Sequence, residues 1–243
     1  MNMRTLVVIP TYDEALNIEQ VVSELHAEQP RVDVLVVDDG SPDGTGGIAD
    51  AMAAADSRVH VLHRTSKQGL GAAYRAGFAW GLSRGYDRLV EMDADGSHRP
   101  RDLEAMIEAS REGADLVVGS RWVPGGGVVN WPWYRRLISR GGTRYARLML
   151  GIDVRDATGG FRVFRRHTLE RLRLEDVASE GYCFQIDMTR RTLAAGMTVV
   201  EVPITFVERE RGSSKMSGRI VREALVRVTL WGLKRLVRRR RTA

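Results

Sequence analysis

The sequence predicts an α/β protein with a mostly parallel central sheet flanked by helices, and three observations support that prediction. Short apolar runs typical of buried strands alternate with segments whose apolar residues recur at helical spacing. Turn-forming residues such as Pro10 and Gly40 close the apolar runs. The chain has 243 residues, 43% of them hydrophobic, which is enough to bury one large core.

The first half of the chain alternates strand and helix in a regular order. Strands are expected over residues 6–9, 32–37, 59–62, 88–92 and 116–119, and helices over 14–29, 48–55, 71–82 and 103–110. The first helix, for example, carries Ile18, Val21 and Leu25 on one face. Helices of this length between strands favour a parallel sheet that is covered on both faces.

The second half is less regular. The pattern predicts a loop over 123–129, a helix over 133–150, a short strand over 161–164, a helix over 185–195 and a strand over 199–207. Pro203 places the last strand at a sheet edge or a bulge. With no repeat and no low-complexity linker, we expect one domain over residues 1–218 and a helical extension over 219–243.

Charge is spread unevenly along the chain. Residues 209–243 contain twelve Lys and Arg against two Glu, a net charge of +10, so the first 208 residues carry −4 and the whole chain +6. A basic extension on a mildly acidic body predicts an anionic surface as the partner of the extension. We expect no nucleic-acid partner, because the main body has no basic face evident in the sequence.

Cysteine usage and apolar segments bear on the compartment. Cys183 is the single cysteine, which excludes an internal disulfide and fits a reducing compartment. The N-terminal apolar run is too short for a signal peptide, and there is no apolar stretch of about 18 residues that would span a membrane. We therefore expect a cytoplasmic location.

Two carboxylates, Asp93 and Asp95, follow the strand over 88–92. Gly96 comes next and lets the backbone turn sharply. Oxygen ligands of this kind suit Mg²⁺ or Mn²⁺, and Mg²⁺ typically takes one or two carboxylates together with substrate phosphates. By itself, the pair is also compatible with a solvated aspartate turn.

Polar residues also follow the first two strands. Tyr12 and Glu14 can stack on a base and bond to a nucleoside, or they can simply begin a helix. Asp38 and Asp39 begin either an Asx-type turn or a second nucleoside contact. Because ligands bind at the carboxyl ends of parallel strands, these side chains are expected on one rim of the sheet.

Cations stand at two further places. Arg121 follows the strand over 116–119, and Arg209 and Lys215 flank a Gly-Ser-Ser segment. Side chains so placed can hold phosphates, or they can form a solvated basic loop. His98 is near the carboxylates, but as a lone loop histidine it is expected to be solvated rather than to bind an ion.

Several short motifs follow one another in a fixed order. They are Ile9-Pro10-Thr11-Tyr12-Asp13-Glu14, Val37-Asp38-Asp39-Gly40-Ser41, Asp93-Ala94-Asp95, Gly119-Ser120-Arg121, Gly159-Gly160-Phe161-Arg162 and Gly181-Tyr182-Cys183-Phe184-Gln185. As a set they resemble the inverting family-2 glycosyltransferases of GT-A fold, and most closely the polyprenol- and dolichol-phosphate mannose synthases of the actinobacterial type. The resemblance covers residues 5 to 218. Asp13 stands where the family commonly has Asn.

The resemblance implies a GT-A fold and transfer of mannose from GDP-mannose to a polyprenyl or dolichyl monophosphate, giving the β-linked product. It assigns the guanosine to residues at the first two strand ends, which are Pro10, Tyr12, Glu14, Val37 and Asp39. It assigns the diphosphate to Asp93, Ala94 and Asp95, with Asp93 and Asp95 binding Mg²⁺ or Mn²⁺. Ser97 stands where some relatives carry a further metal ligand.

The resemblance also implies which cations meet phosphates. Arg121, Arg209 and Lys215 would neutralise phosphates of the donor, and Arg135 and Ser139 would receive the phosphate of the acceptor. Asp95 and Arg121 would stabilise charge during transfer. No residue is expected to act as a general base, because a lipid phosphate with a second pKa of about 6 is already largely ionised near pH 7.

The basic extension predicts an amphipathic helix. Its apolar side is formed by Ile220, Val221, Ala224, Leu225, Val228, Trp231 and Leu236. A basic helix with a Trp suits the surface of an anionic membrane, so we expect peripheral association with the inner face of the cell membrane, where a membrane-protein partner is possible. The alternative is a helix packed on the main domain or on a partner's helix.

Two other functions stay open at this point. A polyprenyl-phosphate glucose synthase using UDP-glucose would need the same motifs, because their spacing does not separate guanine from uracil. A nucleotide-binding regulator without enzymatic activity is the alternative outside the enzyme class. Paired metal carboxylates together with a basic closing loop favour an enzyme.

Overall fold

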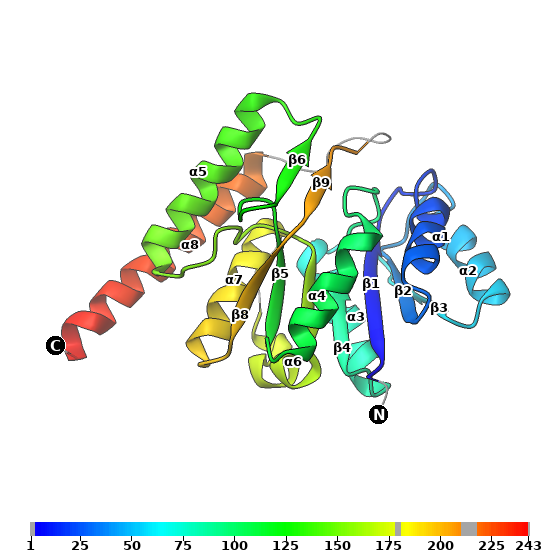
Figure 1. The fold of residues 1–243 in the computed structure, drawn as a ribbon, viewed down its shortest axis with the longest axis horizontal. Helices are drawn as coiled ribbons and strands as arrows, with labels where there is room; N and C mark the ends of the chain where they lie inside the picture. Colours follow the sequence, from blue (N-terminus) through cyan, green and yellow to red (C-terminus); the bar gives the residue numbers. More distant parts are fainter. Residues whose placement is uncertain (1–2, 178–180, 210–217, 243) are drawn as a thin grey trace.

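A computed structural model of the chain describes residues 3–177, 181–209 and 218–242 (Figure 1). The strands are β1 (Thr5–Thr11), β2 (Val32–Asp38), β3 (Val59–His63), β4 (Arg88–Glu91), β5 (Leu116–Ser120), β6 (Gly127–Val129), β7 (Arg162–Arg165), β8 (Val199–Pro203) and β9 (Thr205–Val207). The α-helices are α1 (Ile18–Glu28), α2 (Thr45–Ala55), α3 (Leu70–Ser83), α4 (Leu103–Arg111), α5 (Trp133–Leu150), α6 (Arg166–Leu172), α7 (Gly181–Ala194) and α8 (Gly218–Thr242). Short 3₁₀ helices cover Pro100–Asp102 and Leu174–Asp176.

The main sheet has seven strands in the order β3-β2-β1-β4-β7-β5-β8. Neighbouring strands are parallel except at β7, which runs antiparallel to both β4 and β5. The predicted α/β fold with a mostly parallel sheet is therefore confirmed. Because β2 and β4 flank β1 and both run parallel to it, the carboxyl ends of the three strands lie on one rim.

Helices cover both faces of this sheet, as the alternation of strand and helix predicts. Val7 and Ile9 of β1 face the layer of α1, α2 and α4, whereas Leu6 and Val8 face the layer of α3, α6 and α7. Each of these four side chains is fully buried. Burial on both faces explains why the strands are almost continuously apolar.

The helices α5 and α8 lie side by side and project beyond the sheet (Figure 1). Val228 of α8 packs in a third apolar cluster with Ala146 of α5 and Ile186 of α7. The Tyr145 and Thr229 hydroxyls are 2.6 Å apart and join the two helices. One side of α8 therefore packs on the main body. Among the described residues, no helix has the length and apolarity needed to cross a membrane.

Several boundaries differ from the sequence prediction. The predicted strand over 199–207 is two strands that part at Ile204, because β8 ends at Pro203 and β9 leaves the main sheet to pair with β6. The range predicted as a loop therefore contains β6. Pro203 does lie on an edge strand. The first helix begins at Ile18, because the Asn17 and Ile18 N–H groups both donate to the Glu14 carbonyl in a turn.

Two helices of the second half also differ from the pattern. The helix predicted over 185–195 begins earlier, at Gly181. A short helix, α6, follows β7 where none was expected. Its Leu169 and Leu172 pack into the apolar core on the face of the sheet covered by α3 and α7. Tertiary contacts, rather than the local sequence pattern, therefore stabilise this helix.

Candidate active site

The turn after β1 places Glu14 on the rim. The Glu14 N–H donates to the Thr45 hydroxyl at 3.0 Å, and the Asn17 amide donates to the Glu14 carboxylate at 2.8 Å. Glu14 is buried, and its charge contributes to raising the pKa of Asp93. The structure therefore brings the ends of β1 and β4 together, as the sequence predicts.

The end of β2 forms the neighbouring part of the rim. Asp38 accepts the Ser41 N–H at 3.2 Å, which makes the predicted Asx-type turn. Asp39 is buried and ion-paired with Arg64, and burial raises its pKa despite the opposing charge of Arg64. Lys67 Nζ lies 4.0 Å from the centre of the Tyr12 ring. Two cations that sequence reasoning missed thus stand beside the predicted nucleoside residues.

Asp93 and Asp95 stand at the end of β4, on either side of Ala94. Burial raises the pKa of Asp93, with Asp95 adding to the rise and His98 and Arg209 opposing it. Asp95 accepts the Ser97 N–H at 3.1 Å and forms a 2.7 Å ion pair with Arg209. The predicted phosphate-binding Arg209 is therefore already at the carboxylate pair.

The donor set fits a divalent cation that is shared with phosphates. Two adjacent carboxylates supply hard oxygen ligands, and the Ser97 hydroxyl is buried with no hydrogen-bond partner among the described residues. Within the same residues, no group of three or more His, Cys, Asp or Glu side chains converges to hold a metal by itself. Such an open site suits an ion whose remaining ligands come from a substrate.

His98 supports Asp93 from within the protein. The expectation of a solvated side chain was wrong, because the residue is only 2% exposed. Its ring stacks on Phe161 at 4.9 Å between centroids and meets Phe206 edge-on. Its Nδ1 accepts the Asp93 N–H at 3.1 Å, which fixes the backbone of the first carboxylate. Burial lowers the pKa of His98 and so favours the neutral ring.

Arg121 is held by a partner that sequence reasoning missed. Its Nε and Nη2 each donate to the Asp156 carboxylate at 2.7 Å, and its backbone N–H donates to the same group. Arg121 is 6% exposed and Asp156 is fully buried. A bidentate pair of this kind fixes the guanidinium in one orientation.

The two predicted acceptor residues lie on α5. Arg135 pairs with Glu208 and stacks over Trp131 at 4.5 Å, and Ser139 lies one turn further along the helix. A cavity of about 120 Å³ has Arg121, Arg135 and Ser139 in its lining. The rest of the lining is largely apolar and comes from α5, α7 and α8, namely Trp131, Ile138, Gly142, Tyr145, Ala146, Thr158, Ile186, Ala224, Leu225 and Val228. We call it the acceptor cavity.

The remaining predicted site residues differ in how exposed their side chains are at the rim of the sheet. Val37 is fully buried in the core and Ala94 is 4% exposed, so contacts from these positions to a ligand would use the backbone. Pro10 is half-buried near the end of β1. Lys215 lies outside the described residues, so its predicted role at the phosphates stays a prediction.

A buried glutamate and a buried arginine lie beneath the carboxylates. Glu91 and Arg162 are both fully buried, with Arg162 Nε 3.8 Å from Glu91 Oε2. Arg162 also donates to the carbonyls of Gly159, Gln185 and Ala157. Burial raises the pKa of Glu91 to about 8 against the opposing charge of Arg162, so the folded protein holds a proton on Glu91 at neutral pH.

This proton makes the free energy of unfolding depend on pH. The Glu91 pKa is about 8 in the folded state against 4.5 as its ordinary value, so only the unfolded chain releases the proton in between. The contribution of the Glu91 carboxyl to the free energy of unfolding is therefore lost as pH rises from 4.5 to about 8. The loss is at most about 1.4 kcal/mol per pH unit.

Glu91→Gln removes that titration while keeping the side-chain size. We expect the variant's unfolding free energy, relative to wild type, to increase as pH rises through this window and then to level off. Urea denaturation in metal-free buffer at several pH values measures the difference. A difference that is constant with pH would show that Glu91 does not retain its proton.

Residues 6–173 match the family model described as Glycosyl transferase family 2. The chain is 58% identical over 232 residues to the polyprenol monophosphomannose synthase of Mycolicibacterium smegmatis, covering 95% of this chain and 88% of that protein. It is 59% identical over 231 residues to the undecaprenyl-phosphate mannosyltransferase of Micrococcus luteus, covering 95% of each.

Solved structures with the same fold are more distant in sequence. Mannosyl-3-phosphoglycerate synthase from Rubrobacter xylanophilus superposes with a TM-score of 0.69 at 20% identity, covering 97% of this chain and 75% of that one. A mannosyltransferase from Pyrobaculum calidifontis in complex with GDP-Man and Mn²⁺ gives a TM-score of 0.60 at 18% identity, covering 97% and 64%. These structures show the fold alone.

Proposed function

This chain belongs to glycosyl transferase family 2, and we propose that it transfers mannose from GDP-mannose to a polyprenyl monophosphate with inversion, giving polyprenyl phosphate β-mannose and GDP. Both relatives at 58–59% identity carry names that pair a mannosyl group with a polyprenyl phosphate. Their similarity extends over 95% of this chain.

The acceptor cavity is the observation that supports this acceptor best. Arg121, Arg135 and Ser139 supply cationic and hydroxyl groups, and Ile138, Ile186, Leu225 and Val228 supply apolar surface in the same lining. An amphiphile with a phosphate head and an isoprenoid tail matches both parts. A soluble sugar or amino-acid acceptor would leave the apolar part without a partner.

On the donor side, the rim residues would divide the nucleotide sugar between them. Tyr12, Glu14 and Asp39 would hold the nucleoside, with Arg64 and Lys67 beside it. Arg209, which reaches Asp95, would offset the charge of the diphosphate. A divalent cation, Mg²⁺ or Mn²⁺, held by Asp93 and Asp95 with Ser97 nearby would supply further positive charge for the leaving diphosphate.

The chemistry of transfer would need positioning and charge stabilisation more than proton removal. The acceptor phosphate is largely ionised near pH 7 and can attack the anomeric carbon directly, which inverts the linkage from α to β. Arg121, fixed by Asp156, would keep its guanidinium oriented as charge shifts from the acceptor to the diphosphate. No side chain has to act as a base in this scheme.

Surface side chains support the proposal that the protein acts at a membrane. On α5, Trp133 and Leu137 are 73% and 61% exposed, and on α8 Val226 and Leu230 are 53% and 52% exposed. Exposed apolar side chains of this size on two adjacent helices suit the interface of a bilayer. We propose that this surface, together with the basic end of α8, attaches the protein peripherally to the inner face of the cell membrane.

Two substitutions test the acceptor assignment in opposite directions. Arg135→Ala removes a charged donor from the acceptor cavity, so we expect the KM for polyprenyl phosphate to rise by about 10- to 100-fold with the donor KM unchanged. Glu208→Gln releases Arg135 from its ion pair and should lower the acceptor KM. Initial rates at varied acceptor concentration measure both.

The adjacent exposed Arg136 is the matched control, and Arg136→Ala should leave the acceptor KM within about threefold. If Arg135→Ala and Glu208→Gln moved the acceptor KM in the same direction, the ion pair would be merely structural and the assignment would be wrong.

A further inference from the structure

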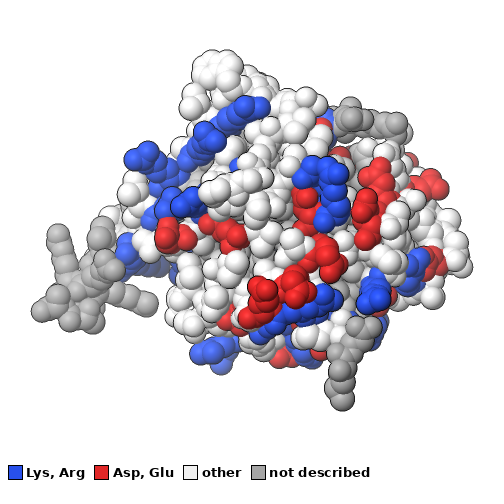
Figure 2. Space-filling model, viewed as in Figure 1, with Lys and Arg blue, Asp and Glu red and all other residues white. Residues whose placement is uncertain are grey.

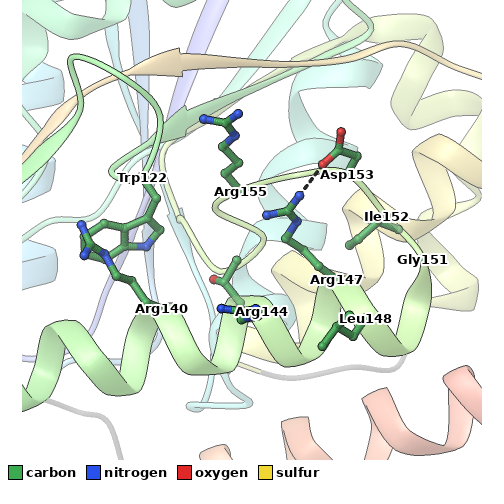
Figure 3. A pocket seen from close by; sticks show the side chains of 10 residues that line it. Trp122, Arg140, Arg144, Arg147, Leu148, Gly151, Ile152, Asp153 and Arg155 are labelled. Carbon is green, nitrogen blue, oxygen red and sulfur yellow. Dashed lines mark hydrogen bonds and ion pairs between the residues drawn. The ribbon is translucent and has the colours of Figure 1, made fainter.

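A second cavity lies along α5, lined by a different part of that helix from the acceptor cavity. It has a volume of about 680 Å³, and its lining includes Trp122, Thr143 and four arginines, which are Arg140, Arg144, Arg147 and Arg155 (Figure 3). We call it the arginine pocket. Three of the arginines come from α5 and one from the segment after it, and cationic side chains follow α5 on the face drawn in Figure 2.

The arginine pocket carries excess positive charge. Asp153 is the one carboxylate in its lining, and it pairs with Arg147. Arg140 stacks over Trp122 at 4.7 Å. Within the described part of the chain, Arg144 and Arg155 have no carboxylate at ion-pair distance. Three of the four guanidinium groups thus have no carboxylate at ion-pair distance among the described residues, and the Glu201 carboxylate reaches only the backbone N–H of Arg155.

This arrangement opposes the stability of the helix that carries it. Arg140, Arg144 and Arg147 are spaced four and three residues apart, so like charges lie on one face of α5. Pairs of like charge at these spacings destabilise a helix. An anion in the pocket would relieve the repulsion.

Two buried polar groups in the lining also lack partners. The Trp122 indole N–H and the Thr143 hydroxyl are both buried with no hydrogen-bond partner among the described residues. Thr143 as a whole is 3% exposed. Unmet buried donors are costly, and phosphate oxygens would accept hydrogen bonds from both.

The arginine pocket shares no residue with the acceptor cavity. The α5 residues lining the acceptor cavity include Ser139, Gly142 and Ala146, whereas those lining the arginine pocket include Arg140, Thr143 and Arg147. The two sets lie on different sides of one helix. With the acceptor assigned to the acceptor cavity as proposed above, a ligand in the arginine pocket is a different group from the reacting phosphate.

We propose that the arginine pocket is a second anion site, which binds phosphate groups. The headgroups of anionic lipids are the favoured source. Leu148 in the lining of the arginine pocket is 73% exposed, and Arg235 of α8 comes close to Gly151, which also lines the pocket. Apolar and cationic groups therefore lie side by side there. This site does not depend on the reaction proposed above.

The test compares variants of the full-length protein that remove charge inside and outside the pocket. Arg144→Gln/Arg155→Gln removes two pocket charges, and Arg101→Gln/Arg171→Gln removes two exposed charges elsewhere. Thr143→Val removes a hydroxyl with no change in charge. The probes are phosphatidylcholine vesicles containing about one third phosphatidylglycerol, and sodium pyrophosphate in solution.

We expect the pocket double variant to bind the anionic vesicles about 30-fold more weakly than wild type, since each of the two cations near an anionic surface contributes about fivefold. Thr143→Val should weaken binding severalfold, and the Arg101/Arg171 control should stay within about threefold. If the pocket double variant lost binding to pyrophosphate but not to the vesicles, the pocket would still be an anion site, and its ligand would be a soluble phosphate compound. If both double variants lost binding equally, or none of the variants did, the proposed site would be refuted.

Discussion

Asp95→Asn is expected to lower kcat for mannosyl transfer by on the order of 10²- to 10³-fold. Asp95 is one of the two carboxylates at the end of β4, and it also forms the 2.7 Å ion pair with Arg209. The amide is nearly the same size but carries no charge. The change therefore removes half of the anionic pair that would hold a divalent cation against the donor's diphosphate.

Initial rates at saturating donor and acceptor, measured over a range of Mn²⁺ or Mg²⁺ concentrations, test this expectation. Asp13→Asn is the matched control, because it makes the same chemical change on the same rim at an exposed side chain. Its backbone φ of 55° is tolerated by Asn as readily as by Asp. Turnover by Asp95→Asn at the control's rate would contradict the metal assignment.

Asp156→Ala should lower the free energy of unfolding by about 3–5 kcal/mol. The substitution leaves the Arg121 guanidinium, which is 6% exposed, without the carboxylate that accepts its hydrogen bonds. For a chain of this length, each kcal/mol lowers Tm by about 2–4 °C, so a shift of roughly 10 °C is expected. Transfer activity should fall as well, because Arg121 loses its fixed orientation.

Thermal and urea unfolding followed by circular dichroism measure this loss. Asp153→Ala is the control, since Asp153 also pairs with an arginine, Arg147, but its side chain is 90% exposed. Ion pairs at such exposure contribute about 0–1 kcal/mol. Equal shifts for the two variants would show that the buried pair does not stabilise the protein more than a surface pair does.

Much of the rim is predictable from sequence because it rests on local patterns. Each strand is a short apolar run, and its first polar residues must lie at its carboxyl end. Parallel pairing then brings Glu14, Asp39 and Asp93 to one edge, because neighbouring parallel strands end together. The structure adds only their spacing and their partners.

The partners of other site residues depend on contacts between distant parts of the chain, which local sequence patterns do not contain. Asp156 lies 35 residues after Arg121, and Glu208 lies 73 residues after Arg135. The burial of His98 depends on Phe161, just before β7, and on Phe206 in β9. The apolar run of β7 predicts a strand, but not its insertion antiparallel between β4 and β5.

Side-chain type was a usable signal for some of the missed residues. Arg64 and Lys67 follow β3, whose carboxyl end lies beside that of β2, so cations there could have been placed next to Asp39. Asp156 lies in an irregular segment whose path is set by the third apolar cluster, which gave sequence reasoning no comparable signal.

We propose that this chain mannosylates a polyprenyl phosphate. The test is to measure the labelled lipid formed when the purified protein is incubated with radiolabelled GDP-mannose or UDP-glucose. Each donor is combined with polyprenyl phosphate or unphosphorylated polyprenol, in Mg²⁺ or in EDTA. We predict a labelled lipid only from GDP-mannose with polyprenyl phosphate and Mg²⁺. A glucosylated lipid from UDP-glucose without the mannosylated one, or no labelled lipid in any combination, would contradict the claim.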